Sequence, residues 1–131
     1  MLKLIIGDRN FSSWSLRPWL ALKQADLPFD ETLIPLRSAT TKADILKYSP
    51  SGKVPCLIDG ETVIWDSLAI CEYLAEKASS LWPSERKARA EARSVSAEMH
   101  AGFMALRQGM PLDVRASQPF MQPSVEVAAD I

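Results

Sequence analysis

Two short β-prone runs with a helical pattern between them constrain the fold of this chain most strongly. The first run spans residues 2–6 and is closed by Gly7, and the second spans residues 29–34. The apolar residues between them recur at helical spacing: Leu16, Trp19, Leu20 and Leu22. We therefore expect a β-α-β unit whose two strands are parallel neighbours joined by a right-handed crossover.

A hairpin and a second clear helix follow this unit. The β-prone runs 54–58 and 62–65 flank the pair Asp59-Gly60, which is typical of a two-residue turn. A helix is predicted from Asp66-Ser67 to about residue 77, and the polar segment 37–51 leaves room for a short helix. The expected order is β-α-β-α-β-β-α, which places the N-terminal part in the α/β class.

A long helical pattern begins at Ser84. Its apolar positions are three or four residues apart: Ala88, Ala92, Val95, Met99, Phe103 and Leu106. Gly109 and Pro111 are expected to end this helix. The segment 124–131 resembles the beginning of another helix, which we expect to stop before it buries any side chain.

The junction at residues 79–83 contains small residues and a proline, and it predicts a domain boundary. Residues 1–78 are expected to form the α/β domain, and residues 84–131 the start of an all-helical region that looks truncated. A chain of 131 residues is long enough for one domain and part of another.

Composition excludes several classes of function. The formal net charge of −1 gives no overall field that would attract nucleic acid or anionic lipid. The N-terminal apolar run is too short for a signal peptide or a membrane span, so we expect a cytoplasmic protein. Cys56 and Cys71 with a single histidine suggest neither a disulfide framework nor a metal site, and two buried, reduced thiols are expected.

Three serines precede the first helix. Proline lacks an N–H, so Pro18 is expected within the first helical turn, which makes Ser15 the earliest capping residue. Ser12 and Ser13 are then free in the loop, near the positive end of the helix dipole. Such a place stabilises an anion, either a thiolate or a phosphate. The alternative is that the serines only cap the helix.

Three segments together resemble the glutathione S-transferases, most closely the zeta and theta classes and related bacterial proteins. They are SSWSLR at 12–17 followed by Ala21-Leu22, SPSGKVPCLIDG at 49–60, and DSLAICEYL at 66–74. The first resembles the serine motif of the family, the second its cis-proline segment and the third its third helix. The resemblance covers roughly residues 2–83.

The resemblance implies a thioredoxin-like domain that binds glutathione as co-substrate, followed by an all-α domain, usually in a cytoplasmic homodimer. It implies an enzyme of detoxification in which a glutathione thiolate attacks an electrophilic small molecule. The residue that holds the thiolate would be Ser12 first and Ser13 second, with Ser15 as the cap. No metal is implied.

The resemblance also assigns contacts with the rest of glutathione. The residues concerned are Ser15, Lys53, Val54, Pro55, Asp66 and Ser67. The Val54 backbone beside a cis-proline would pair with the tripeptide like an added strand. Asp66 would take the γ-glutamyl ammonium, the helix N-terminus at Ser67 its carboxylate, and Lys53 another carboxylate of the tripeptide. Without the resemblance, Asp66 and Ser67 would be interpreted as an ordinary cap and Lys53 as a solvated lysine.

The second-substrate pocket would lie between the two domains and is expected to be half built. Its candidates are Trp14, His100, Phe103 and Arg107. Two other functions stay open. One is a glutathione-fold interaction module without turnover, and the other is a glutathione-dependent isomerase of the maleylacetoacetate isomerase type. Trp14 stands where the zeta-class motif has cysteine, which argues against the isomerase.

Overall fold

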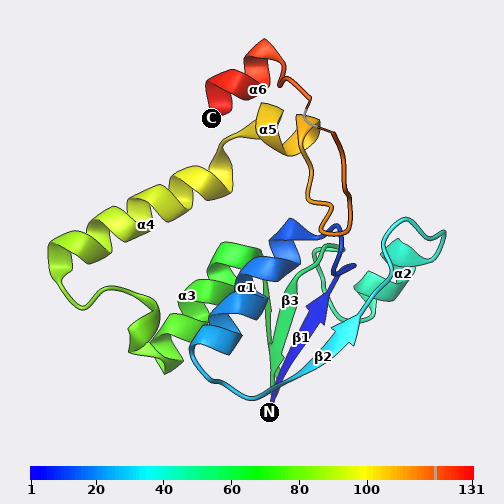
Figure 1. Ribbon diagram of the computed structural model, residues 1–131. Coiled ribbons are helices and arrows are strands. Elements are labelled where there is room, and N and C mark those ends of the chain that lie inside the picture. Colours follow the sequence, from blue (N-terminus) through cyan, green and yellow to red (C-terminus); the bar gives the residue numbers. More distant parts are fainter. Residues whose placement is uncertain (120) are drawn as a thin grey trace.

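A four-stranded mixed sheet organises the N-terminal part of the chain (Figure 1). The computed structural model describes residues 1–119 and 121–131. Strands β1 (Leu2–Ile6), β2 (Phe29–Leu33), β3 (Cys56–Asp59) and β4 (Thr62–Trp65) lie in the order β2-β1-β3-β4. The β1–β2 pair is parallel, and the β1–β3 and β3–β4 pairs are antiparallel. The predicted β-α-β unit and hairpin are therefore confirmed.

The hairpin turn lies one residue later than its sequence predicts. Asp59 pairs with Thr62 at the end of the ladder, so Gly60 and Glu61 form the turn instead of Asp59-Gly60. Gly60 has a φ of 61°, a left-handed conformation that glycine adopts without steric cost.

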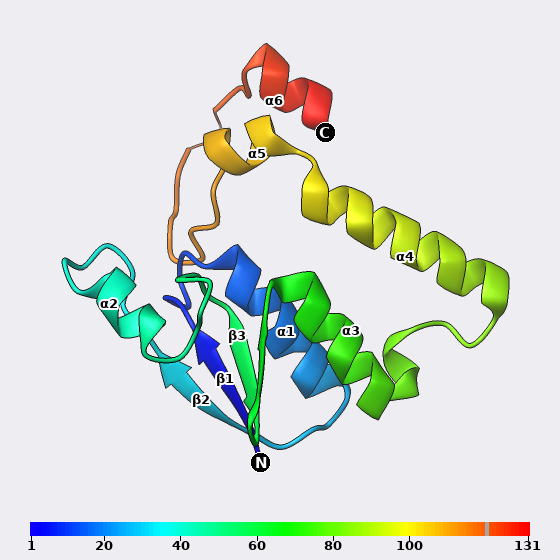
Figure 2. The same ribbon diagram turned by 180° about the vertical axis from the view of Figure 1, so that it is seen from behind.

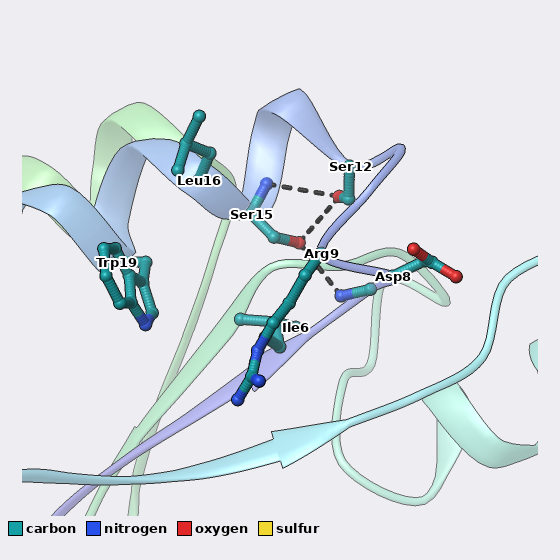
Figure 3. A pocket seen from close by; sticks show the side chains of 8 residues that line it. Ile6, Asp8, Arg9, Ser12, Ser15, Leu16 and Trp19 are labelled. Carbon is teal, nitrogen blue, oxygen red and sulfur yellow. Dashed lines mark hydrogen bonds between the residues drawn. The ribbon is translucent and has the colours of Figure 1, made fainter. Parts of the chain in front are cut away.

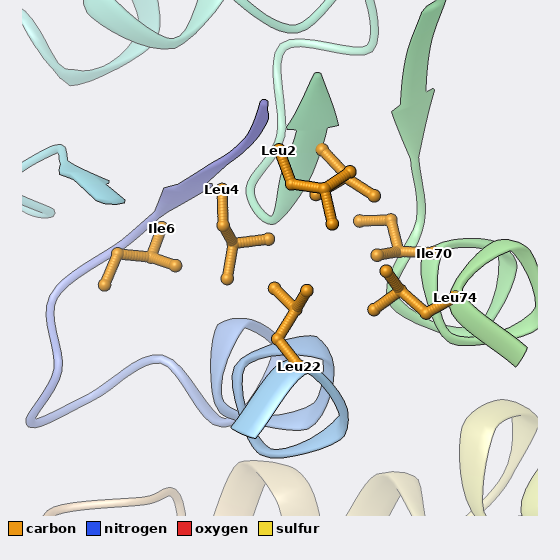
Figure 4. Close-up of a cluster of buried hydrophobic side chains, with 7 residues drawn as sticks. Leu2, Leu4, Ile6, Leu22, Ile70 and Leu74 are labelled. Atoms are coloured by element: carbon orange, nitrogen blue, oxygen red, sulfur yellow. The ribbon is translucent and has the colours of Figure 1, made fainter. Parts of the chain in front are cut away.

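Helices cover both faces of the sheet. Helices α1 (Ser13–Gln24) and α3 (Ser67–Lys77) lie side by side on one face, as Figures 1 and 2 show. Alternate residues of β1 meet them in the main core, drawn in Figure 4: Leu2, Leu4, Ile6, Leu22, Leu57, Ile70 and Leu74. Helix α2 (Thr41–Leu46) contributes Ile45 to a smaller cluster that contains Ile5, on the opposite face.

Helix α1 begins three residues earlier than a cap at Ser15 would allow. Ser12 is its N-cap and Ser13 its first residue, so Pro18 lies inside the helix, beyond the first turn. Pro18 cannot donate a backbone hydrogen bond there. Its side chain is fully buried, so burial of the ring offsets part of that loss.

The predicted long helix is broken into two. A short 3₁₀ helix, η1 (Ser79–Leu81), precedes α4 (Arg86–Ala101), and α5 (Met104–Gly109) follows after a bend. Gly102 is extended and Phe103 is left-handed with a φ of 62°. The apolar periodicity continues across this break, but glycine is a poor helix former, so the helix ends there.

The C-terminal segment is packed, which corrects the expectation that it buries nothing. Helix α6 (Val125–Asp130) lies against α5 (Figures 1 and 2). Val127 is only 5% exposed. A carboxylate oxygen of Asp130, Oδ2, accepts a hydrogen bond of 2.9 Å from the backbone N–H of Leu106. In the described residues, no helix is long and apolar enough to cross a membrane.

Candidate functional site

A crevice of about 480 Å³ opens beside Pro55. It is formed where the loop before β3, the junction between β4 and α3, and residues of α1 and α4 meet. The residues that line it are Trp14, Ser51, Lys53, Val54, Pro55, Trp65, Asp66, Ser67 and His100. Five of the residues assigned to glutathione are thus brought together, with two of the second-substrate candidates.

The loop before β3 presents backbone to this crevice. The Val54-Pro55 peptide bond is cis, as expected. Pairing between β1 and β3 ends with Ile5 and Cys56, so Val54 lies just beyond the ladder. An extended peptide can add to backbone at such a position as a further strand.

Ser51 and Trp65 line the crevice and were missed as site residues. Ser51 Oγ accepts a hydrogen bond of 3.2 Å from the backbone N–H of Lys53 and so shapes the loop. Trp65 is the last residue of β4 and directly precedes Asp66. The side chain of Trp65 is 48% exposed. The sequence does not predict this exposure, because strand periodicity does not distinguish a tryptophan in the core from one at a crevice.

Asp66 holds the start of α3 in a strained conformation. Its φ is 76°, outside the range that most residues adopt. Asp66 Oδ1 accepts hydrogen bonds from the backbone N–H groups of Leu68, at 2.9 Å, and Ala69, at 3.2 Å. The carboxylate is therefore both a helix cap and an exposed negative group at the crevice. Ser67 follows as the first residue of α3, where the helix dipole is positive.

His100 reaches the crevice from α4. Its Nε2 lies 3.1 Å from Oδ2 of Asp66, and its ring meets Trp14 edge to face with centroids 5.3 Å apart. His100 Nδ1 is buried and has no hydrogen-bond partner among the described residues. The histidine therefore connects the second-substrate candidates to the aspartate at the crevice.

The roles of Ser12 and Ser15 are reversed relative to the sequence expectation (Figure 3). Ser12 caps α1: its Oγ accepts from the Ser15 backbone N–H at 3.3 Å. The Ser12 hydroxyl also donates to Ser15 Oγ at 2.8 Å, and Ser15 Oγ accepts from the Gly7 backbone N–H at 3.0 Å. Both side chains are buried, and Ser12 is not free in the loop. The cap assignment was wrong because two serines have the same capping preference, and the Gly7 N–H that binds Ser15 belongs to the end of the preceding strand, outside the helix pattern.

Ser12 and Ser15 line a separate pocket of about 140 Å³ with Ile6, Leu16 and Trp19 (Figure 3). Gly7 lines this pocket and lies close to Val54, which lines the crevice: a Cβ added to Gly7 would lie 3.1 Å from Cγ2 of Val54. The start of α1 is thus tied to the Val54 loop through Gly7.

Five predicted residues do not line the crevice: Ser12 and Ser15, which line the separate pocket, and Ser13, Phe103 and Arg107. Ser13 is half-buried at the first position of α1. Phe103 lies in the bend after α4. Arg107 belongs to α5, where its Nε donates to the Gly102 carbonyl at 2.9 Å and its guanidinium stacks on Trp14. Arg107 therefore contacts Trp14, one of the residues that line the crevice.

Both cysteines are free thiols. Burial raises the pKa of Cys71 to about 11, and burial also raises the pKa of Cys56. A thiol reacts as its thiolate, so neither side chain is suited to nucleophilic chemistry at neutral pH. Within residues 1–119 and 121–131, no group of three histidine, cysteine or acidic residues is placed to hold a metal ion.

Comparison with known proteins gives a consistent result. The profile of the family "Glutathione S-transferase, N-terminal domain" matches residues 11–77. A "Probable maleylacetoacetate isomerase" of Caenorhabditis elegans is 35% identical over 100 residues, which are 75% of this chain and 46% of the worm protein. A "Glutathione S-transferase zeta class" of Euphorbia esula is 41% identical over 76 residues, 58% of this chain and 33% of the plant protein.

Solved structures agree. A glutathione transferase homologue from Sulfitobacter, with bound glutathione, superposes with a TM-score of 0.71 at 26% identity. The match covers 84% of this chain and 54% of that chain. The present chain therefore spans less than half the length of the two curated relatives and about half of this structure.

The Ser15 hydrogen bonds give a stability prediction. Ser15→Ala removes the acceptor of the Gly7 N–H and of the Ser12 hydroxyl, and leaves buried donors unpaired. We expect the free energy of unfolding to fall by about 1–3 kcal/mol, measured by urea denaturation followed by circular dichroism. Ser94→Ala is the control, because the exposed Ser94 hydroxyl only donates to a carbonyl of its own helix. Equal losses in the two variants would contradict the structural role of Ser15.

Proposed function

The chain belongs to the glutathione S-transferase family, and from that premise we propose that it binds glutathione in the crevice beside Pro55. The observation that carries the proposal is the meeting of three groups: the Val54 backbone, the Asp66 carboxylate and the N-terminus of α3 at Ser67. A tripeptide with an extended backbone, one ammonium and two carboxylates matches these groups. The bound glutathione in the Sulfitobacter homologue supports this ligand.

Each end of glutathione finds a complementary group in this arrangement. The central cysteinyl residue pairs with the Val54 backbone beyond the end of the β1–β3 ladder. The γ-glutamyl ammonium lies against Asp66, and the γ-glutamyl carboxylate lies at the N-terminus of α3. Lys53 lines the crevice and attracts the remaining carboxylate.

We propose that a serine at the start of α1 holds the glutathione sulfur as a thiolate. Ser12 is the first candidate and Ser13 the second. In the structure, the Ser12 hydroxyl donates to Ser15, so it must turn from Ser15 to serve the sulfur, while its oxygen still accepts from the Ser15 N–H. Among the described residues, the Ser13 hydroxyl forms no hydrogen bond, so Ser13 remains the alternative.

The reaction proposed is nucleophilic transfer. The thiolate attacks an electrophilic carbon, the carbon–sulfur bond forms, and the leaving group departs with its bonding electrons. The isomerase is the second candidate, favoured by the likeness to the C. elegans protein. In that reaction glutathione would add and leave again unchanged. The interaction module without turnover is the third.

The wider setting is part of the same proposal. We assign residues 1–78 to the glutathione-binding domain, 79–83 to a linker and 84–131 to the beginning of a helical domain. The protein would act in detoxification, in the cytoplasm and as a homodimer, with an electrophilic small molecule as its second substrate.

A substitution at Asp66 tests glutathione recognition. Asp66→Asn keeps a side chain that caps α3 but removes the negative charge that attracts the ammonium. We expect the dissociation constant of glutathione, measured by isothermal titration calorimetry, to rise about tenfold or more, since a hydrogen bond to a charged group contributes about 1.5–3 kcal/mol. The control is Asp44→Asn, a change of the same type on α2. Unchanged affinity in Asp66→Asn would contradict the assignment.

Ser12→Ala and Ser13→Ala test the thiolate partner. The pH dependence of conjugation with 1-chloro-2,4-dinitrobenzene reports the pKa of the bound thiol. Removing the partner hydroxyl should raise that pKa toward the ordinary thiol value of about 8.5 and reduce the rate at neutral pH, by an amount worth about 1.5–3 kcal/mol. Ser12→Ala also removes the α1 cap, so its stability is measured in parallel. A pH profile that neither substitution moves would refute the serine assignment.

A further inference from the structure

The loop between β1 and α1 leads directly to the two serines proposed for the thiolate. Asp8 shapes this loop: its Oδ1 accepts a hydrogen bond of 2.8 Å from the backbone N–H of Asn10, and its carbonyl accepts one of 2.9 Å from the backbone N–H of Ser12. Loops are more mobile than helices and strands unless further contacts hold them. The positions of Ser12 and Ser13 therefore depend on what else contacts this loop.

A segment from the C-terminal part of the chain contacts the loop at Asn10. Residues 110–117 run from α5 to the loop after β1, as Figures 1 and 2 show. Asn10 Nδ2 donates a hydrogen bond of 2.7 Å to Asp113 Oδ1, and Asn10 Oδ1 accepts one of 2.9 Å from the backbone N–H of Arg115. The Asn10 carbonyl also accepts from the backbone N–H of Val114 at 3.2 Å. Both ends of one amide side chain are thus bound by residues 103 and 105 positions away.

Trp14, which follows the two serines, is held from the same part of the chain. The guanidinium of Arg107, on α5, lies 4.5 Å from the centroid of the Trp14 ring, and that of Arg17 lies 4.2 Å from the same centroid. A cation over an aromatic ring is attracted by it, so both arginines orient this ring. Arg107 is itself held, because its Nε donates to the Gly102 carbonyl.

The segment that holds Asn10 starts from a packed pair of helices. Helix α5 precedes it along the chain and α6 follows it. These helices contact each other: Val127 of α6 is buried, and Asp130 Oδ2 accepts a hydrogen bond from the backbone N–H of Leu106. Ser12 and Ser13 therefore lie between two residues, Asn10 and Trp14, that α5 and the segment after it both contact.

We propose that Asn10 is a positioning residue for the thiolate. Through its hydrogen bonds with residues 113–115, it keeps Ser12 and Ser13 where one of their hydroxyls meets the glutathione sulfur. Asn10 acts through the loop and does not itself contact the sulfur. A hydrogen bond weakens steeply as its angle departs from linear, so a displaced hydroxyl stabilises the thiolate less. This inference rests on the proposed function, because it gives Asn10 a role only when glutathione lies in the crevice.

A pH titration of the glutathione complex, followed by the difference absorbance of the thiolate, tests this role without turnover. Asn10→Ala removes both side-chain hydrogen bonds to the segment and adds no charge. We expect it to raise the pKa of the bound thiol toward the ordinary value of about 8.5. Conjugation of 1-chloro-2,4-dinitrobenzene at neutral pH should slow about threefold to tenfold. The deficit should disappear at about pH 10, where the thiol ionises without help.

An exchange of side chains between positions 10 and 113 separates positioning from charge. Asn10→Asp alone sets two carboxylates against each other in place of the 2.7 Å hydrogen bond, so it should raise the thiol pKa as Asn10→Ala does. Addition of Asp113→Asn restores a donor and an acceptor with their roles reversed. The double variant should therefore recover the wild-type thiol pKa, although residue 10 still carries the added negative charge.

Urea denaturation of each variant is the control for a purely structural role. Reduced stability of Asn10→Ala with an unmoved thiol pKa, or a double variant as impaired as Asn10→Asp, would overturn the inference and leave the proposed function standing. A thiol pKa that Ser12→Ala and Ser13→Ala also leave unmoved, or no glutathione binding by the wild type, would overturn the proposed function and this inference with it.

Discussion

The hydrogen bond from the Gly7 backbone N–H to Ser15 Oγ ties the end of β1 to the first turn of α1. Ser12 adds to this tie by donating to the same oxygen. Because Gly7 also lies close to Val54, the strand end, the helix start and the cis-proline loop are held at one place. The crevice depends on this arrangement, since Trp14 enters it from α1 and Val54 from the loop. A short buried contact thus positions two sides of the site.

Sequence patterns predicted the parts of the fold that depend on local periodicity. The spacing of apolar residues in 2–34 is enough to predict the β-α-β unit, because the buried side chains recur with a different period in a strand than in a helix. Capping is less predictable: Ser12 and Ser15 have the same local preference, and a backbone donor at the end of β1, Gly7, decides between them. The break at Gly102 has a local signal that the apolar periodicity conceals, whereas the burial of Val127 depends on contacts made after α6 has folded back on α5. Local sequence does not contain those contacts.

Some site residues could likewise be predicted from sequence motifs, and others could not. Lys53, Val54 and Asp66 belong to segments that carry the resemblance, and the structure gathers them in one crevice. Arg17 lies in the first of those segments but was not singled out, because the sequence does not show that Arg107, ninety positions later, contacts the same tryptophan ring. A net charge of −1 conceals this local concentration of positive charge. Contacts between residues far apart in the sequence therefore bring two like charges to one ring, which motif spacing alone does not reveal.

The central claim is that the crevice beside Pro55 is where a tripeptide thiol binds. Backbone amide chemical shifts of the isotope-labelled chain during a glutathione titration test it most directly. The account predicts that the largest and saturable shifts fall on Val54, Asp66 and Ser67, around the crevice. Shifts centred on the separate pocket at Leu16 and Trp19, or none at millimolar glutathione, would contradict it.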